Sequence, residues 1–242
     1  GMNKLKPLPE EWSGLLNNEQ KEAIENINGP LLIIAGAGSG KTRVLTYRYA
    51  HLIKTYGINF ENVLAITFTN KAANEMKDRI SELLNLELSP KWISTFHSLC
   101  VKMLRIHGHL IGFNNNFTIY DQSDSTKLVR NCMRDSDIDT KQYSPKRIQA
   151  HISSLKNQRI LPGEAVEFAQ SFFDVKVAEI YSSYQKKLML ANSMDFDDLL
   201  IKAVELLETS DKSLNYWSSK FQYIMIDEYQ DTNMVQYRLV EL

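Results

Sequence analysis

The chain has 242 residues, of which 43% are hydrophobic, and a formal net charge of −1. This length permits one large domain or a domain with an insert, and the near-zero charge excludes a protein that is basic throughout. The charge is uneven, however: residues 100–190 carry 13 basic against 9 acidic side chains, and residues 191–242 carry 4 against 10. A mildly basic middle is compatible with a polyanionic partner and does not by itself identify one.

The two cysteines are Cys100 and Cys132, and no apolar run is long enough to span a bilayer. No signal peptide opens the sequence. We therefore expect a cytoplasmic protein in a reducing compartment, without a membrane partner.

The first part of the chain alternates between helix and strand patterns. Strands that alternate with helices predict a parallel sheet covered on both faces. The expected order is a helix over 17–27, a strand over 31–35, a helix over 43–55, a strand over 63–67, a helix over 71–84, a strand over 92–96 and a helix over 97–109.

After residue 110 the pattern becomes mostly helical, and it returns to a strand at 221–226. We therefore expect an α/β fold in three parts: residues 1–110, a helical insert at 111–191, and residues 192–242. Helices in and after the insert are expected over 121–133, 144–158, 172–190, 199–208 and 232–242.

The stretch at 31–42 (LLIIAGAGSGKT) runs from an apolar strand through a glycine-rich turn into a helix. Its glycines let successive backbone N–H groups point at an anion, and the helix N-terminus adds its dipole. Lys41 then supplies charge for the β- and γ-phosphates, and the Thr42 hydroxyl reaches a Mg²⁺ ion. The phosphate-loop pattern is met except at its first position, where Ala35 stands. The dinucleotide fingerprint fails because Lys41 occupies a position where it requires glycine.

Asp227 and Glu228 directly follow the strand predicted at 221–226. An aspartate there can hold Mg²⁺, directly or through water, and an adjacent glutamate can polarise the attacking water. Two adjacent acids are common on solvated loops, but together with a phosphate loop they favour a nucleotide site.

Two polar elbows follow predicted strands, at 68–70 (FTN) and 95–97 (TFH). Both should lie at the carboxyl edge of the sheet, where open α/β sheets bind ligands. They offer aromatic rings for base stacking and short hydroxyl or amide groups for phosphate oxygens. Alternatively, the rings belong to the core and the polar residues cap the next helix; for Phe96 the two interpretations stand equal.

Two further positions also allow two interpretations. Gln20 stands three residues after Asn17, so its amide either reaches back to the N-cap backbone in a capping box or holds an adenine.

His97 and Cys100 have the spacing of zinc ligands, with two histidines downstream. Because a second clean ligand pair is missing, we expect Cys100 in the core and ordinary histidines.

Taken together, these motifs resemble superfamily 1 DNA helicases of the UvrD/Rep/PcrA group. They occur in the family's order and cover almost the whole chain. The box at 227–232 (DEYQDT) is the most discriminating, because most phosphate-loop enzymes do not continue the acidic pair in this way. The motifs that carry the resemblance are Gln20 and residues 35–42 (AGAGSGKT), 66–73 (ITFTNKAA), 94–97 (STFH), 195–199 (DFDDL) and 227–232.

The resemblance implies a RecA-like phosphate-loop NTPase domain with a parallel sheet, and a helical insert that matches the family's accessory 1B subdomain. It implies ATP and Mg²⁺ as cofactors and ATP-driven movement 3′ to 5′ along single-stranded DNA. Nucleotide contacts would come from Gln20, Ala37, Gly38, Ser39, Gly40, Lys41, Thr42 and Arg43, and contacts to single-stranded DNA from Phe68, Asn70, Thr95 and His97.

The resemblance also implies individual catalytic roles. Thr42 and Asp227 would hold the metal ion. Glu228 would activate water while Lys41 serves the phosphates, and Gln230 would link the nucleotide site to the DNA track.

The family's third motif, its second RecA-like domain and that domain's arginines are not among these residues. We therefore expect an N-terminal piece of a helicase that depends on a missing C-terminal RecA-like domain and unwinds little or no DNA by itself. Its sheet would have a gap, an exposed edge or a partner strand beside the phosphate-loop strand.

Three alternatives remain: a nucleotide- and DNA-binding module without turnover, the helicase part of a recombination nuclease–helicase, and a small-molecule kinase. The two elbows and the DEYQDT box tell against the kinase.

Overall fold

The computed structural model describes residues 6–18, 20–21, 31–34, 39–228, 238 and 242. The chain divides into two compact units: the first holds Gly1–Leu99 and Asn215–Thr232, and the second holds Cys100–Leu214 and Asn233–Leu242. Two of the three boundaries between the units fall inside helices, one in α5 (Phe96–His107) and one in α10 (Asp211–Lys220).

The first unit is built on a parallel sheet whose described strands follow the order β1-β6-β2-β3. β6, the strand farthest along the sequence, lies between β1 and β2, and β1 has a described neighbour on one side only. Apolar runs covered on both faces are typical of parallel strands, and all four residues of β2 are buried. The strands are β1 (Leu31–Ile34), β2 (Val63–Ile66), β3 (Ile93–Ser94) and β6 (Tyr223–Glu228).

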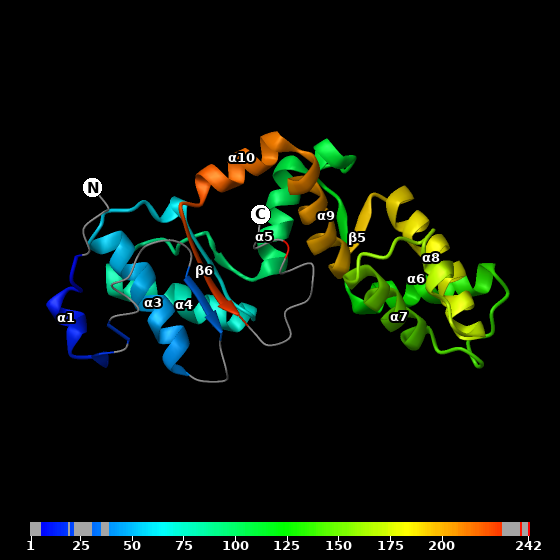
Figure 1. Ribbon diagram of the computed structural model, residues 1–242, viewed down its shortest axis with the longest axis horizontal. Helices are drawn as coiled ribbons and strands as arrows, with labels where there is room; N and C mark the ends of the chain where they lie inside the picture. Colours follow the sequence, from blue (N-terminus) through cyan, green and yellow to red (C-terminus); the bar gives the residue numbers. More distant parts are fainter. Residues whose placement is uncertain (1–5, 19, 22–30, 35–38, 229–237, 239–241) are drawn as a thin grey trace. The chain divides into compact units, whose positions relative to one another are not determined.

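Helices α3 (Ser39–Lys54) and α4 (Asn70–Leu84) pack against this sheet (Figure 1). Their apolar faces and the strands share one buried cluster, so the sheet and the two helices form a single core. The short helix α1 (Glu10–Ser13) packs on α3, where the rings of Trp12 and Tyr47 meet edge to face at 5.6 Å. The cluster contains Leu45, Tyr49, Leu52, Val63, Ala65, Ala73, Met76, Ile80, Ile93 and Met225.

Side-chain caps fix where the helices after β2 and β3 begin. The hydroxyl oxygen of Thr69 accepts the backbone N–H of Ala72 at 3.0 Å, and α4 begins at the next residue. Thr95 does the same for α5 by accepting the N–H of Ser98 at 3.2 Å. Such a cap satisfies a donor that the first helical turn leaves without a partner.

The second unit is mainly helical, with a core of its own (Figure 1). A two-stranded parallel sheet of β4 (Thr118–Tyr120) and β5 (Ser193–Asp195) lies beside the helices. Its main helices are α6 (Gln122–Asp135), α7 (Pro145–Asn157), α8 (Phe172–Leu190) and α9 (Phe196–Thr209). Short 3-10 helices lie at Gly108–Ile111 and Ala165–Phe168 in this unit, and another lies at Phe60–Asn62 in the first unit.

The expected α/β fold with a parallel sheet is confirmed, and so are the helices that begin at Asp121, Ser144-Pro145 and Phe172. The sequence patterns missed β4, β5, α1 and α10, all of which are short or polar. The helix expected over 232–242 and most of the one over 17–27 lie outside the described residues. The three-part division of the chain stays a prediction.

No helix in the described ranges is both long and apolar enough to cross a membrane.

Candidate nucleotide and nucleic-acid site

The acidic pair lies beside the end of β1, the strand that the glycine-rich residues follow in the sequence. β1 and β6 run parallel, with Ile33 opposite Asp227 and Ile34 opposite Glu228. The glycine-rich residues follow Ile34 directly in the sequence, so the acids stand beside the point where the phosphate loop begins. The register therefore brings together two motifs that lie nearly 200 residues apart in the chain.

Helix α3 begins at Ser39, which places Lys41 and Thr42 in its first turn. That turn carries no acidic residue, so nothing in it opposes an anion at the helix N-terminus. The side chains of residues 39–42, like that of Glu228, lie outside what the structure describes, as do Ala37, Gly38 and Gln230 entirely. Their predicted roles stay predictions.

Asp227 is 9% exposed at the carboxyl end of β6. A carboxylate at this edge, together with a hydroxyl from the first turn of α3, supplies the hard oxygen ligands that Mg²⁺ prefers. The donor set thus fits the ion that the sequence suggests.

Gln20 takes part in a capping box. Its amide oxygen accepts the backbone N–H of Asn17 at 3.0 Å, and its own N–H donates to the Asn17 side chain at 2.8 Å. The capping interpretation is therefore confirmed, whereas contact with adenine stays a prediction. Nearby, Arg43 of α3 donates to the carbonyl oxygen of Leu15 at 2.7 Å, which ties the segment ahead of Gln20 to the phosphate-loop helix.

The two predicted elbows also lie side by side. Ile66, the last residue of β2, is opposite Ser94, the last residue of β3, and the N–H of Thr67 donates to the Ser94 carbonyl at 2.9 Å. Ile66 also pairs with Ile226 of β6. The elbows, the acidic pair and the start of the phosphate loop therefore share the carboxyl edge of one sheet, as parallel strands require.

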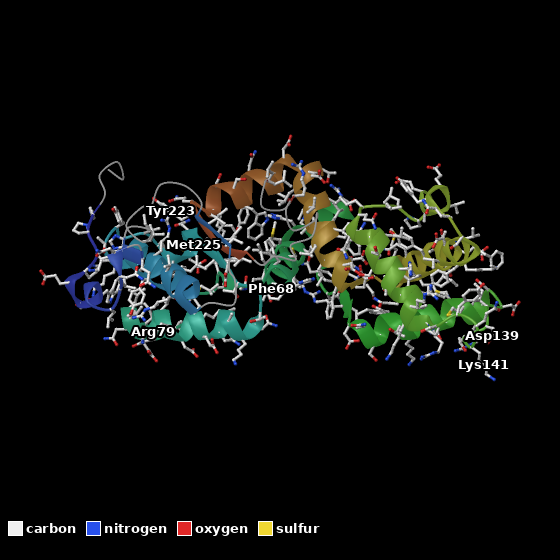
Figure 2. The ribbon with its side chains drawn as sticks, turned by 60° about the horizontal axis from the view of Figure 1, so that its bottom comes forward. Phe68, Arg79, Asp139, Lys141, Tyr223 and Met225 are labelled. Carbon is white, nitrogen blue, oxygen red and sulfur yellow. The ribbon has the colours of Figure 1, made fainter. Side chains whose placement is uncertain are left out.

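The elbow residues differ in what they offer to a ligand. The ring of Phe68 is 50% exposed at the start of α4 (Figure 2), and Asn70 is exposed in the first turn of α4. Thr95 is buried, and its hydroxyl is engaged with Ser98. Phe96 and His97 are half-buried, which leaves both interpretations of Phe96 open.

Cys100 is fully buried in the chain, and burial raises the pKa of its thiol. It therefore belongs to the core, as the sequence analysis expected.

The second unit contains a buried ionic cluster that the sequence analysis did not foresee. The ammonium of Lys156 on α7 lies 2.8 Å from a carboxylate oxygen of Asp195 and 3.0 Å from one of Asp198. The hydroxyl of Tyr184 donates to the same Asp195 oxygen at 2.7 Å, and the amide of Gln185 donates to Asp198 at 3.2 Å. We call these five residues the α9 clamp.

In the α9 clamp, Lys156 and each of the two carboxylates favour the other's charged form, against the effect of burial. Burial alone would lower the pKa of Lys156, but the two carboxylates outweigh it and raise that pKa. Burial likewise opposes ionisation of Asp195, yet the nearby Lys156 holds its pKa below the usual range. For Asp198 burial dominates and raises the pKa to about 6.

Phe196, the first residue of α9, was also missed. It follows the last residue of β5 directly, and its ring is 47% exposed. An aromatic residue just after a short strand, next to a helix cap, was the signal that could have identified it.

The match to a known family covers nearly the whole chain. Residues 16–242 match the model described as the UvrD/REP helicase N-terminal domain. Two curated relatives, ATP-dependent DNA helicase PcrA of Staphylococcus aureus and of Staphylococcus epidermidis, are each 46% identical over 227 residues. That alignment covers 94% of this chain and 31% of each relative, so the chain spans about a third of their length.

The fold and the edge site define a phosphate-loop protein with a parallel α/β sheet. The chain belongs to the UvrD/REP helicase N-terminal domain family.

Proposed function

We propose that this chain is the ATP-binding and single-stranded-DNA-contacting portion of an ATP-dependent 3′–5′ DNA helicase. The observation that carries the proposal is the register of β1 and β6, which aligns Ile34 with Glu228. It puts an acidic pair beside a phosphate loop, and this pairing of motifs serves phosphoryl transfer.

Within this proposal each part of the edge has one task. The phosphate loop and the first turn of α3 bind the phosphates, with Lys41 as their cation. Thr42 and Asp227 hold Mg²⁺, which when bound neutralises charge on the phosphates. Glu228 accepts a proton from the attacking water, and Gln230 links this site to the DNA-contacting surface.

The DNA-contacting surface lies along the same edge. The exposed ring of Phe68 stacks on a base, because aromatic stacking is the sequence-tolerant way to hold a single strand. Asn70 and His97 contact the sugar–phosphate backbone from the two neighbouring elbows. Thr95 is buried with its hydroxyl bonded to Ser98, so it serves this contact by capping α5. On the second unit, taken by itself, the exposed ring of Phe196 offers a stacking contact to a base.

ATP turnover with and without a single-stranded oligonucleotide tests the enzymatic part, with Glu228→Gln as the blank. Turnover that the oligonucleotide stimulates and the substitution abolishes would mean that the chain completes its own site. ATP binding without turnover would support an intact half-site that depends on arginines from a second RecA-like domain. Absence of ATP binding would contradict the proposal.

The second candidate is a binding module that holds nucleotide and DNA without turnover. Lys41→Ala should then abolish nucleotide binding and leave DNA binding largely intact. Clear unwinding of a tailed duplex by this chain would exclude this candidate.

A further inference from the structure

Lys156 is the unusual member of the α9 clamp. It sits near the C-terminal end of α7 and is 2% exposed, although lysine is almost never fully buried unless it is paired. The nucleotide site described above makes no use of it. Its partners all belong to the second unit, so the cluster can be considered by itself.

The clamp contacts are concentrated on the first turn of α9. Lys156 binds positions 195 and 198, and its neighbour Asn157 donates to a carboxylate oxygen of Asp197 at 3.1 Å. Two consecutive residues of α7 therefore hold three of the four positions 195–198. The fourth position is Phe196, which points its half-exposed ring to the surface.

Neither capping nor stability explains Lys156. Asp195 and Asp198 already form a capping box through each other's backbone N–H groups. Helices α4 and α5 each begin on a neutral threonine whose hydroxyl oxygen accepts a backbone N–H. A buried ion cluster of this kind is often no more stable than neutral side chains of similar volume. What the cation adds is a fixed direction for the turn, because a charge bound to two carboxylates tolerates little displacement.

A pocket of about 310 Å³ adjoins this turn. Its lining comprises three carboxylates, among them Asp195 of the α9 clamp, together with amides, hydroxyls and the Phe196 ring: Asp121, Gln122, Ser125, Gln149, Ala150, Ser153, Asp195, Phe196 and Asp197. No lysine or arginine of the described residues lines it. The carboxylates repel a phosphate, whereas carboxylates, amides and hydroxyls can all bind the polar edge of a base. Because Phe196 is part of this lining, the orientation of its ring matters for any base that approaches.

We propose that Lys156 is a positioning residue: through Asp195 and Asp198 it fixes the first turn of α9, and thereby the orientation in which Phe196 presents its ring to a base. This inference rests on the proposed function, because it takes the ligand of Phe196 to be single-stranded DNA.

The first experiment measures the environment of the ring at position 196 directly, without DNA. 4-Fluorophenylalanine is placed at position 196 of the 242-residue chain, and its fluorine resonance is recorded. The test variant is K156M/D195N/D198N, which removes all three charges while asparagine keeps the N-cap. The control is K187M/D135N, which removes a more exposed ion pair between α8 and α6 in the same unit.

We expect one narrow resonance in the unsubstituted chain and in the control, and a shifted or broadened one in the triple variant. An unchanged resonance in a folded triple variant would overturn the proposal. If the triple variant does not fold, Tyr184→Phe replaces it, because it removes one clamp hydrogen bond and keeps every charge. An unchanged resonance in that variant would count against the proposal in the same way.

The second experiment measures binding of a short fluorescein-labelled oligothymidine. Phe196→Ala should weaken binding about fivefold or more in the unsubstituted chain, and less than about twofold in the triple variant. Equal losses in both backgrounds would overturn the positioning role. An unsubstituted chain that does not bind the oligonucleotide would instead refute the proposed function, while the fluorine experiment still reports on the clamp.

Discussion

Each unit has an exposed phenylalanine between a strand and the helix that follows it. Phe68 precedes the cap residue Thr69 of α4, whereas Phe196 follows the cap residue Asp195 of α9. Phe68 follows β2, which lies inside the four-stranded sheet and pairs with both β6 and β3. Phe196 follows β5, which pairs only with the three-residue β4 among the described strands. The next helix begins on neutral Thr69 in the first case and on charged Asp195, held by Lys156, in the second.

The comparison between the two units indicates what fixes the direction of the backbone at the start of each helix. In the first unit the sheet already fixes the direction of the chain as it leaves β2, so one neutral hydroxyl is enough to start α4. In the second unit the sheet has only two described strands, and a two-stranded sheet is marginally stable by itself. There, side chains of α7 and α8 fix the direction of the chain as it leaves β5. We therefore expect substitutions in the α9 clamp to lower the free energy of unfolding far more than substitutions at the elbow after β2.

The largest effect is expected from Lys156→Met. It leaves two buried carboxylates without their cation, and breaking a buried pair in this way costs about 3–5 kcal/mol of unfolding free energy. Urea denaturation followed by circular dichroism measures the loss. The control, Lys202→Met, removes a partly exposed helical pair and should cost less than about 1 kcal/mol. Equal losses would mean that the clamp does no more than a surface pair.

A smaller effect is expected from Tyr184→Phe. The lost hydrogen bond runs to an ionised carboxylate, and bonds to charged groups contribute about 1.5–3 kcal/mol. Tyr181→Phe, one turn earlier on α8, loses a hydrogen bond of 2.8 Å to the neutral carbonyl of Ile160. It should cost only about 0.5–1.5 kcal/mol. The same denaturation experiment ranks the two variants, and the reverse order would contradict a charged clamp.

The elbow after β2 should respond more weakly still. Thr69→Ala removes one cap from an exposed helix start, for an expected loss of about 1 kcal/mol. Thr69→Ser keeps the hydroxyl and should restore most of the stability. If Thr69→Ala lowered the free energy of unfolding as much as Lys156→Met does, the proposed difference between the start of α4 and the start of α9 would be wrong.

The sequence made the elbow at Phe68 predictable, because its cues are local. An apolar run followed by a polar, capping segment identifies a strand, an edge and a helix start within a few residues. The parallel sheet then follows from the alternation of such units. The capping box at Asn17 and Gln20 could be read in the same way, since its partners stand three residues apart.

The α9 clamp could not be predicted from the sequence. Lys156 meets Asp195 and Asp198 only across 39 and 42 residues, and nothing near Lys156 in the sequence marks it as buried. The strands β4 and β5 have three residues each and carry too little pattern to detect. Pairings of this kind depend on tertiary packing, which overrides local preference.

The smallest effect is expected at Glu61, a carboxylate of the first unit. Its oxygen accepts the indole N–H of Trp92 at 2.8 Å, and Lys220 lies 3.3 Å away. The hydrogen bond from Trp92 and the charges of Lys220 and Lys91 lower the pKa of Glu61 from its ordinary value of 4.5. The stabilisation is therefore present above about pH 4.5 and is lost as the pH falls through the lowered pKa.

Because Glu61 is nearly half exposed, Glu61→Gln should cost less than about 1 kcal/mol near neutral pH. Glutamine keeps an acceptor for Trp92 and loses only the charge. Urea midpoints of the two proteins should therefore converge as the pH is lowered. A gap that widens in acid would mean that burial, rather than the Trp92 and Lys220 contacts, governs this carboxylate. The first unit would then resemble the buried chemistry of the α9 clamp, and the contrast between the two units would fail.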